Sequence, residues 1–293
     1  MKNANISIIT IGVLLLLFFS CKSTSSLAVE LKDSLTFYIS FDNTTTADFA
    51  LGDANIYTAK ASYVDSKRKL ERVKVGMNNA EHRIVKGKGQ FGDAFEFNYK
   101  KGSEVIYYKS KGNIAYNPQN WSGTISFWLS VDPATDLGWY TDPIQITDKN
   151  YNDASIWVDF TDEDPPSFRL GVIGDKNEWT QDTLDSPMKV EFEKRTVKIE
   201  KPTFTRKVWT HVLITYDGLG TPQSLANLYL NGENKGAING IDDPFSWDLE
   251  ESKIFLGLGF TGLMDELSIF NKPLTEKQAM ELYQLKGGIK SIL

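Results

Sequence analysis

Segments in which every second residue is apolar recur along most of this chain. Successive side chains of a β-strand point to opposite faces of a sheet, so this alternation predicts strands with one buried face. Asn231-Gly232 follows one such segment and favours the tight turn of a β-hairpin. Short strands separated by turns predict an all-β fold, a two-sheet antiparallel β-sandwich of the jelly-roll kind. The predicted strands are 35–41, 94–97, 124–131, 155–160, 168–172, 209–216 and 228–230.

One short helix is predicted near the C-terminus. Thr275 and Gln278 have the spacing of a capping box, which marks the start of a helix. Leu282 and Tyr283 then lie on one side and are expected to pack on the sandwich, and Gly287 ends the helix. Elsewhere, the mixed charges of residues 190–199 predict an exposed charged strand or hairpin with a solvated face.

Residues 1–20 have the pattern of a secretion signal. One basic residue precedes an apolar run, 6–19, that is too short to span a bilayer as a helix. Cys21, the only cysteine in 293 residues, follows this run. The arrangement resembles a bacterial lipoprotein signal, which implies cleavage before Cys21 and lipid attached to its thiol. The alternatives are a buried free thiol and an uncleaved anchor.

The predicted location is the bacterial cell envelope. Residues 21–33 are expected to form the lipidated cysteine and a polar tether, and the acyl chains would hold the protein at a membrane surface. No acidic residue follows Cys21 directly, which favours the outer membrane. The sequence leaves open whether the domain faces the periplasm or the medium. A net charge of −6 argues against nucleic acid as a partner.

Asp265 is out of place on an apolar strand. Alternation places Leu263, Asp265, Leu267 and Ile269 on one face, so the carboxylate lies among three apolar neighbours. Burying an unpaired charge is costly, so Asp265 is expected to have a strong partner. The adjacent Glu266 would point to the opposite face, which argues against a catalytic pair.

Several short motifs follow one another in a defined order: 41–43, 89–97, 124–129, 209–218, 228–232, 262–270 and 273–275. As a set they resemble the bacterial LamG-like jelly-roll domains of the concanavalin A-like lectin/glucanase superfamily. The resemblance covers residues 34–286 and leaves a C-terminal tail, 287–293. It implies two antiparallel sheets of about six strands each.

The resemblance also implies a possible structural calcium site, for which the matching residues are Asp42 and Asp265. Carboxylate and carbonyl oxygens are the ligands that calcium prefers. The alternative is that Asp265 accepts hydrogen bonds from backbone N–H groups at a sheet edge, with no metal.

No catalytic residue is predicted. Retaining glycosidases need two carboxyl groups about 5 Å apart, and the carboxylate-rich strand that glycosidases of this superfamily carry is missing from this sequence. The chain has only two histidines, His82 and His211, and His211 is interpreted as structural.

Five aromatic residues are candidates for carbohydrate binding. Trp128, Trp157 and Tyr229 are predicted on strand faces opposite the core, beside small polar residues, and Trp139 and Trp179 fall in predicted loops. Aromatic planes flanked by hydrogen-bonding groups suit the apolar face and the hydroxyls of a sugar. The alternative is that the outward aromatics pack under a long loop or the terminal helix.

These observations favour an envelope-anchored, non-catalytic binding module for carbohydrate, either a polysaccharide or the glycan of a glycoprotein. One alternative is a structural or adhesive surface lipoprotein with protein partners. A second is a polysaccharide-active enzyme with an unfamiliar site.

Overall fold

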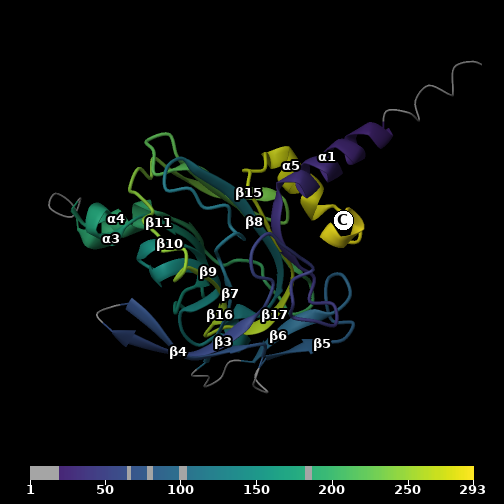
Figure 1. Ribbon diagram of the computed structural model, residues 1–293, viewed down its shortest axis with the longest axis horizontal. Coiled ribbons are helices and arrows are strands. Elements are labelled where there is room, and N and C mark those ends of the chain that lie inside the picture. Colours follow the sequence, from purple (N-terminus) through teal and green to yellow (C-terminus); the bar gives the residue numbers. More distant parts are fainter. Residues whose placement is uncertain (1–19, 65–66, 78–81, 99–103, 182–186) are drawn as a thin grey trace, which may run out of the picture.

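The computed structural model describes residues 20–64, 67–77, 82–98, 104–181 and 187–293. Two antiparallel sheets pack face to face, as Figure 1 shows, so the predicted β-sandwich is confirmed. Within the described residues the sheets contain nine and eight strands, more than the six apiece that the family resemblance implied.

The first sheet has the strand order β15-β14-β13-β8-β17-β1-β2, with β6 also paired to β17 and β5 to β6. Its strands are β1 (Leu35–Ile39), β2 (Phe49–Ala50), β5 (His82–Val85), β6 (Ala94–Asn98), β8 (Trp121–Ser130), β13 (Thr210–Leu219), β14 (Leu225–Leu230), β15 (Glu233–Asn239) and β17 (Thr261–Phe270).

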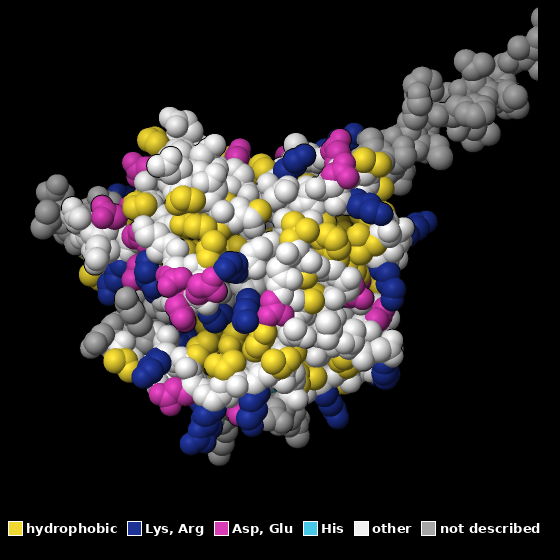
Figure 2. Space-filling view, in the orientation of Figure 1, with side chains coloured by type: hydrophobic (Ala, Val, Ile, Leu, Met, Phe, Trp, Pro, Cys, Tyr) yellow, Lys and Arg dark blue, Asp and Glu magenta, His cyan; other side chains and the backbone are white. Residues whose placement is uncertain are grey.

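The second sheet has the order β12-β11-β10-β9-β16-β7-β3-β4. Its strands are β3 (Tyr57–Val64), β4 (Lys67–Val75), β7 (Glu104–Lys109), β9 (Thr141–Asn150), β10 (Asp153–Phe160), β11 (Phe168–Ile173), β12 (Thr196–Ile199) and β16 (Lys253–Leu258). In Figure 2 basic side chains project from the lower edge of the molecule, where Figure 1 places β3 and β4.

The core between the sheets is built from the alternating positions that the sequence predicted. Ile125, Phe127 and Leu129 of β8 face Ile156 and Val158 of β10 within one cluster of fully buried side chains. Because alternate residues face the core, the residues between them are directed to the outer faces of the sandwich. The outer face of β10 therefore carries Trp157 and Asp159.

A β-bulge in β17 overturns the predicted face of Asp265. The register of β17 on β8 shifts between Asp265 and Ser268, and Glu266 has a positive φ of 54°. The extra residue moves Met264 and Leu267 into the core, whereas Asp265 is buried outside it. The expectation that Leu263, Asp265, Leu267 and Ile269 share one face is wrong, because simple alternation does not continue through a bulge.

The helices are α1 (Ser20–Ser34), α2 (Pro133–Asp136), α3 (Lys176–Trp179), α4 (Met188–Lys194) and α5 (Glu276–Tyr283), followed by the short 3₁₀ helix η2 (Ile289–Ser291). The predicted C-terminal helix is confirmed: Thr275 and Gln278 form both hydrogen bonds of a capping box at the start of α5. No helix in the described ranges has the length and apolar character needed to cross a membrane.

Both ends of the described chain pack on the first sheet. Residues 21–33, predicted as a polar tether, belong to α1, because Leu27 and Leu31 lie one turn apart and join the same apolar cluster as Leu282 of α5. The predicted tail 287–293 is also fixed, since the Ile289 amide donates to the Glu266 carboxylate at 2.8 Å. Residues 1–19 of the predicted signal peptide lie outside the described residues.

Residues 190–199 also differ from expectation. They form the end of α4 and then β12, instead of one exposed charged strand or hairpin. Glu191 and Arg195 are four residues apart and both are buried. The helical spacing brings these two opposite charges together, whereas a solvated strand would have exposed them to water. This helix and α3 stand beside the outer face of the second sheet.

Candidate functional site

The outer face of the second sheet contains a cleft of about 940 Å³. Strands β4, β7, β9, β10, β11 and β16 contribute to it, and α3, α4 and the loop before β9 supply further side chains. Aromatic side chains and charged side chains both line the cleft. Concave sites of this size that mix aromatic planes with a few polar groups are typical ligand-binding sites.

Trp157 forms the aromatic centre of the cleft and is only 1% exposed. Its indole N–H donates to the Tyr151 carbonyl at 2.7 Å, and its ring stacks on Phe192 of α4 with centroids 6.2 Å apart. On the neighbouring strand Gly171 leaves room for this ring, because a Cβ there would lie 2.2 Å from it. The Trp157 ring is therefore held in one orientation.

Trp139 and Trp179 line the same cleft in different ways. Trp179, at the end of α3, is 1% exposed and donates from its indole N–H to the Asn152 carbonyl at 3.1 Å. Trp139 lies in the loop before β9, is 70% exposed, and contacts Tyr140 edge to face. Trp179 is thus a fixed, buried part of the side of the cleft, whereas Trp139 presents an exposed aromatic surface.

Two carboxyl groups lie on the floor of the cleft. Asp159 of β10 accepts hydrogen bonds from both Nε, at 2.9 Å, and Nη2 of Arg169. Asp142 of β9 accepts one from the Gln145 amide. Burial raises the pKa of Asp142 to about 8, and the charge of Asp159 adds to this effect. Burial also raises the pKa of Asp159, but Arg169 opposes the change. Of the two carboxyl groups, Asp159 is the one that pairs directly with the Arg169 guanidinium.

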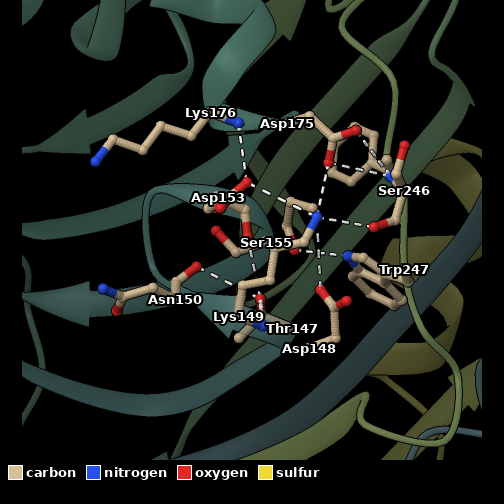
Figure 3. Close-up of polar contacts among 12 residues, drawn as sticks. Thr147, Asp148, Lys149, Asn150, Asp153, Ser155, Asp175, Lys176, Ser246 and Trp247 are labelled. Carbon is tan, nitrogen blue, oxygen red and sulfur yellow. Dashed lines mark hydrogen bonds and ion pairs between the residues drawn. The ribbon is translucent and has the colours of Figure 1, made fainter. Parts of the chain in front are cut away.

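A lysine surrounded by three carboxylates stabilises the β9–β10 hairpin beside the cleft (Figure 3). The Lys149 ammonium lies 2.8 Å from the Ser246 carbonyl, 3.1 Å from Asp175, 3.8 Å from Asp153 and 4.0 Å from Asp148. Burial by itself lowers the pKa of Lys149, but the surrounding carboxylates hold it above its ordinary value. This contact ties the hairpin to the start of α3, which carries Trp179.

A buried arginine connects α4 to Asp243 and to Trp179 of α3. Arg195 donates from Nε to Asp243 at 2.7 Å and from Nη1 to the Glu191 carbonyl at 2.9 Å. Its guanidinium also lies over the Trp179 ring, 5.6 Å from the centroid. The position of these aromatic side chains therefore depends on a charged residue that does not itself line the cleft.

Trp128 and Tyr229 do not line this cleft. Both lie on the outer face of the first sheet, where Tyr283 of α5 covers Trp128 and the apolar side of α5 packs on Tyr229. The His211 ring lies tilted against Trp128, with ring centroids 4.8 Å apart, and shares a hydrogen bond with Ser126; burial lowers the pKa of His211 to about 3. Of the five aromatic candidates the structure brings together Trp139, Trp157 and Trp179, and it places the other two beneath the terminal helix.

Asp42 and Asp265 form a second polar site at the turn before β6. Asp265 is fully buried, and its Oδ2 accepts the Phe91 N–H at 2.9 Å, which agrees with the backbone-capping alternative. Burial raises the pKa of Asp265 to about 8, and the charges of Glu266 and Asp42 add to the increase. Asp42 accepts the Asp93 N–H at 2.9 Å and pairs with Lys290 at 2.8 Å.

This second site has one oxygen to offer a cation. Asp265 Oδ1 is buried and has no hydrogen-bond partner within the described part of the chain. The same residues contain no cluster of three or more His, Cys, Asp or Glu side chains suited to a metal. Calcium takes six to eight oxygen ligands, so Asp42 and Asp265 would need backbone oxygens or waters to complete its coordination.

The sequence interpretation missed most polar residues of the cleft. Alternation placed Asp159 beside Trp157, but Asp142 and Gln145 gave no separate signal because they belong to a different segment of the chain. For Arg169 a signal did exist, since it alternates with the core residues Phe168 and Leu170. Only the pairing of β9, β10 and β11 shows that these side chains meet.

Residues 110–280, more than half of the chain, match the family Laminin_G_3, described as the concanavalin A-like lectin/glucanases superfamily. No curated protein matches this sequence. Many solved structures have a similar fold.

Three solved structures illustrate the fold similarity, each below 20% identity. The binding domain of Paraclostridial Mosquitocidal Protein 1 is 16% identical with a TM-score of 0.53, matching 86% of this chain and 52% of that one. The botulinum neurotoxin serotype D binding domain is 14% identical with a TM-score of 0.56, matching 88% and 52%. Domain 4 of AbnA, a GH43 arabinanase from Geobacillus stearothermophilus solved with arabinotriose, is 18% identical with a TM-score of 0.51, matching 86% and 98%. This chain therefore corresponds to about half of each toxin domain and to nearly all of the arabinanase domain.

Proposed function

This chain belongs to the concanavalin A-like lectin/glucanase superfamily, and from that premise we propose that it is a non-catalytic module that binds a carbohydrate chain in the aromatic cleft. One observation carries the proposal. Trp139, Trp157 and Trp179 converge on one cleft together with carboxyl, amide and guanidinium groups. Aromatic faces accept the apolar face of a sugar ring, and the polar groups pair with its hydroxyls.

Features of similar structures support this proposal. The arabinanase domain was solved with a bound trisaccharide, and the two toxin domains are binding domains. The fixed orientations of Trp157 and Trp179 support it as well, because a ligand loses less affinity to ordering when the site is already formed.

The exposed Trp139 provides the sharpest test of carbohydrate binding. We expect the purified protein to bind at least one member of a panel of immobilised plant, algal and microbial polysaccharides. Trp139→Ala should weaken that binding about tenfold, equivalent to ~1.4 kcal/mol, because it removes an open stacking surface. Isothermal titration calorimetry with the best polysaccharide measures the change.

Leu51→Ala serves as the matched control, because Leu51 is also exposed but lies outside the cleft. Both variants should keep the melting temperature of the parent protein. Failure of every glycan to bind, or equal binding by Trp139→Ala and the parent, would contradict the proposal. Release of new reducing ends from a bound polysaccharide would contradict its non-catalytic part.

We also propose that calcium binds at Asp42 and Asp265. Its support is the buried Asp265 Oδ1, which lacks a partner among the described residues. Calcium added to EDTA-treated protein at ~100 times its Kd should add about 2.7 kcal/mol of stability. For a domain of this size that corresponds to a rise of about 5–10 °C in Tm, which differential scanning calorimetry detects.

The control for calcium binding compares two aspartates. Asp265→Asn should abolish the calcium-dependent rise, whereas Asp242→Asn, at an exposed position, should keep it. An unchanged Tm of the parent protein after EDTA treatment and calcium addition would show that the Asp265 carboxylate is stabilised by hydrogen bonding alone.

For the location of the protein we propose the bacterial cell envelope, with a lipid anchor at Cys21 and the outer membrane as the target. The apolar run before Cys21 and its place as the only cysteine support this proposal. Cys21→Ser should move the protein from the membrane fraction to the soluble fraction of cells. Equal membrane association of both forms would contradict lipid anchoring at this residue.

A further inference from the structure

Arg68 of β4 lines one end of the cleft and has an unused hydrogen-bond donor. Its guanidinium lies over the Phe255 ring, 4.3 Å from the centroid, and Nη2 donates to the Tyr63 hydroxyl at 3.2 Å. The other terminal nitrogen, Nη1, is buried and has no partner in the part of the chain that the structure describes. A buried N–H group without an acceptor costs free energy, which an acceptor on a ligand would recover.

The two arginines of the cleft differ in what they can bind. Arg169 gives two of its donors to the Asp159 carboxylate. Arg68 forms no ion pair with any carboxylate of the described residues, although its charge acts on Asp142. Arginine pairs most strongly with planar anions that accept two hydrogen bonds, so Arg68 has the chemistry to bind an anion from the ligand.

The carboxyl group on which the charge of this arginine acts, Asp142, does not cancel that charge at neutral pH. Burial raises the pKa of Asp142 to about 8, so this group is mostly protonated there. Gln145 donates its amide N–H to Asp142, while its own Oε1 is buried without a donor among the described residues. The floor of the cleft therefore offers a cationic donor at Arg68 and a neutral acceptor at Gln145.

The hairpin that carries Arg68 is basic, although the protein as a whole is acidic. Residues 57–75 contain six Lys and Arg against two Asp and Glu, whereas the whole chain has a net charge of −6. Lys60, Lys69 and Lys74 of this hairpin are exposed. A basic edge next to a cleft raises the local concentration of an anionic polymer.

We propose that the cleft selects an acidic glycan, with Arg68 binding the carboxylate of a uronic acid or a sulfate ester and Gln145 accepting a hydrogen bond from a sugar hydroxyl. This inference rests on the proposed carbohydrate binding and adds the charge of the ligand. Trp139, which is 70% exposed, would stack on a sugar ring while Arg68 distinguishes an acidic polymer from its neutral equivalent.

Matched polymers test the proposal without any substitution. Polygalacturonate is compared with its carboxyl-reduced form, and dextran sulfate with dextran, by affinity electrophoresis and calorimetry at pH 7. We expect at least one acidic polymer to bind at least tenfold more tightly than its neutral partner. The pair that shows the difference identifies the anion as carboxylate or sulfate.

Substitutions then assign the effect to Arg68. Arg68→Gln should lower affinity for the acidic polymer at least tenfold and leave affinity for the neutral one within twofold, and Arg68→Lys should recover part of the loss. The control Lys69→Gln changes an adjacent exposed charge and should alter affinity less than threefold. Each variant must keep the parent Tm, and the polymer comparison stands even if Arg68→Gln does not fold.

Three outcomes separate this inference from the broader proposal. Equal binding of acidic and neutral polymers would overturn acidic selectivity and leave carbohydrate binding intact. Acidic selectivity that Arg68→Gln and Lys69→Gln weaken equally would overturn the role of Arg68, because it would then come from the net charge of the hairpin. Failure of all charged and neutral glycans to bind would overturn the carbohydrate function itself.

Discussion

Arg195→Ala is expected to destabilise the protein by about 3–5 kcal/mol, because it removes the buried cation that pairs with Asp243 at 2.7 Å. The Arg195 side chain is only 6% exposed, so water cannot replace the lost hydrogen bonds. For a domain of this size the loss corresponds to a fall of roughly 6–20 °C in Tm. Thermal and urea unfolding of the two proteins measure it.

Lys189→Ala is the control for this prediction. Lys189 also belongs to α4, but its side chain is 86% exposed and its ion pair with Glu193 spans 3.8 Å. Exposed pairs of this kind contribute little, so we expect a change within about 0.5 kcal/mol. A loss at Arg195→Ala no greater than at Lys189→Ala would show that the buried arginine does not hold α4 in place.

The Arg195 substitution should also weaken ligand binding at temperatures where the variant is still folded. The arginine supports Trp179 from behind and does not itself line the cleft. Because Arg195 does not line the cleft, a lower affinity of the variant for carbohydrate would show that binding needs Trp179 to be held in place beforehand.

Lys149→Met is expected to destabilise the protein by about 3 kcal/mol. The substitution removes the ammonium that lies within 4.0 Å of Asp148, Asp153 and Asp175, so their negative charges then repel one another. Burial raises the pKa of Asp148, so this carboxylate takes up a proton as the pH falls and the repulsion weakens. The loss should therefore be smaller at pH 4 than at pH 7. Urea unfolding at the two pH values measures both effects.

Lys176→Met is the matched control, since this residue is close in space but directs its ammonium away from the cluster, as Figure 3 shows. Only its backbone N–H contacts Asp153, at 2.9 Å, and the substitution keeps that contact. Equal stability losses at the two lysines, or a loss at Lys149→Met that does not depend on pH, would contradict the proposed electrostatic role.

The strands and their inner faces were predictable because alternation is a local property. Phe127 and Val158 face the core for the same reason: each belongs to a segment in which every second residue is apolar. The start of α5 was also predictable, since Thr275 and Gln278 form the capping box within one turn of chain. The bulge at Glu266 was not predictable from the sequence, because it depends on how β17 pairs with β8.

The candidate site was predictable only in part. Trp128 and Trp157 have the same local signature, an aromatic residue on the outer face of a strand beside serine. Helix α5 covers Trp128, whereas the outer face around Trp157 is open to a cleft. Local sequence indicates which way a side chain points but carries no information about what lies opposite it.

The sequence by itself determined which segments form strands, most of their inward faces and the capped helix, because each is set by residues a few positions apart. The tertiary structure alone decided which aromatic residues share a cleft, and which charges surround Lys149, Arg195 and Arg68. Those groups come from strands and helices distant in the sequence, and only strand order and register bring them together. Asp265 illustrates both levels. The sequence predicted that its charge needs a partner, and the bulge in β17 determined which side of the sheet its carboxylate faces.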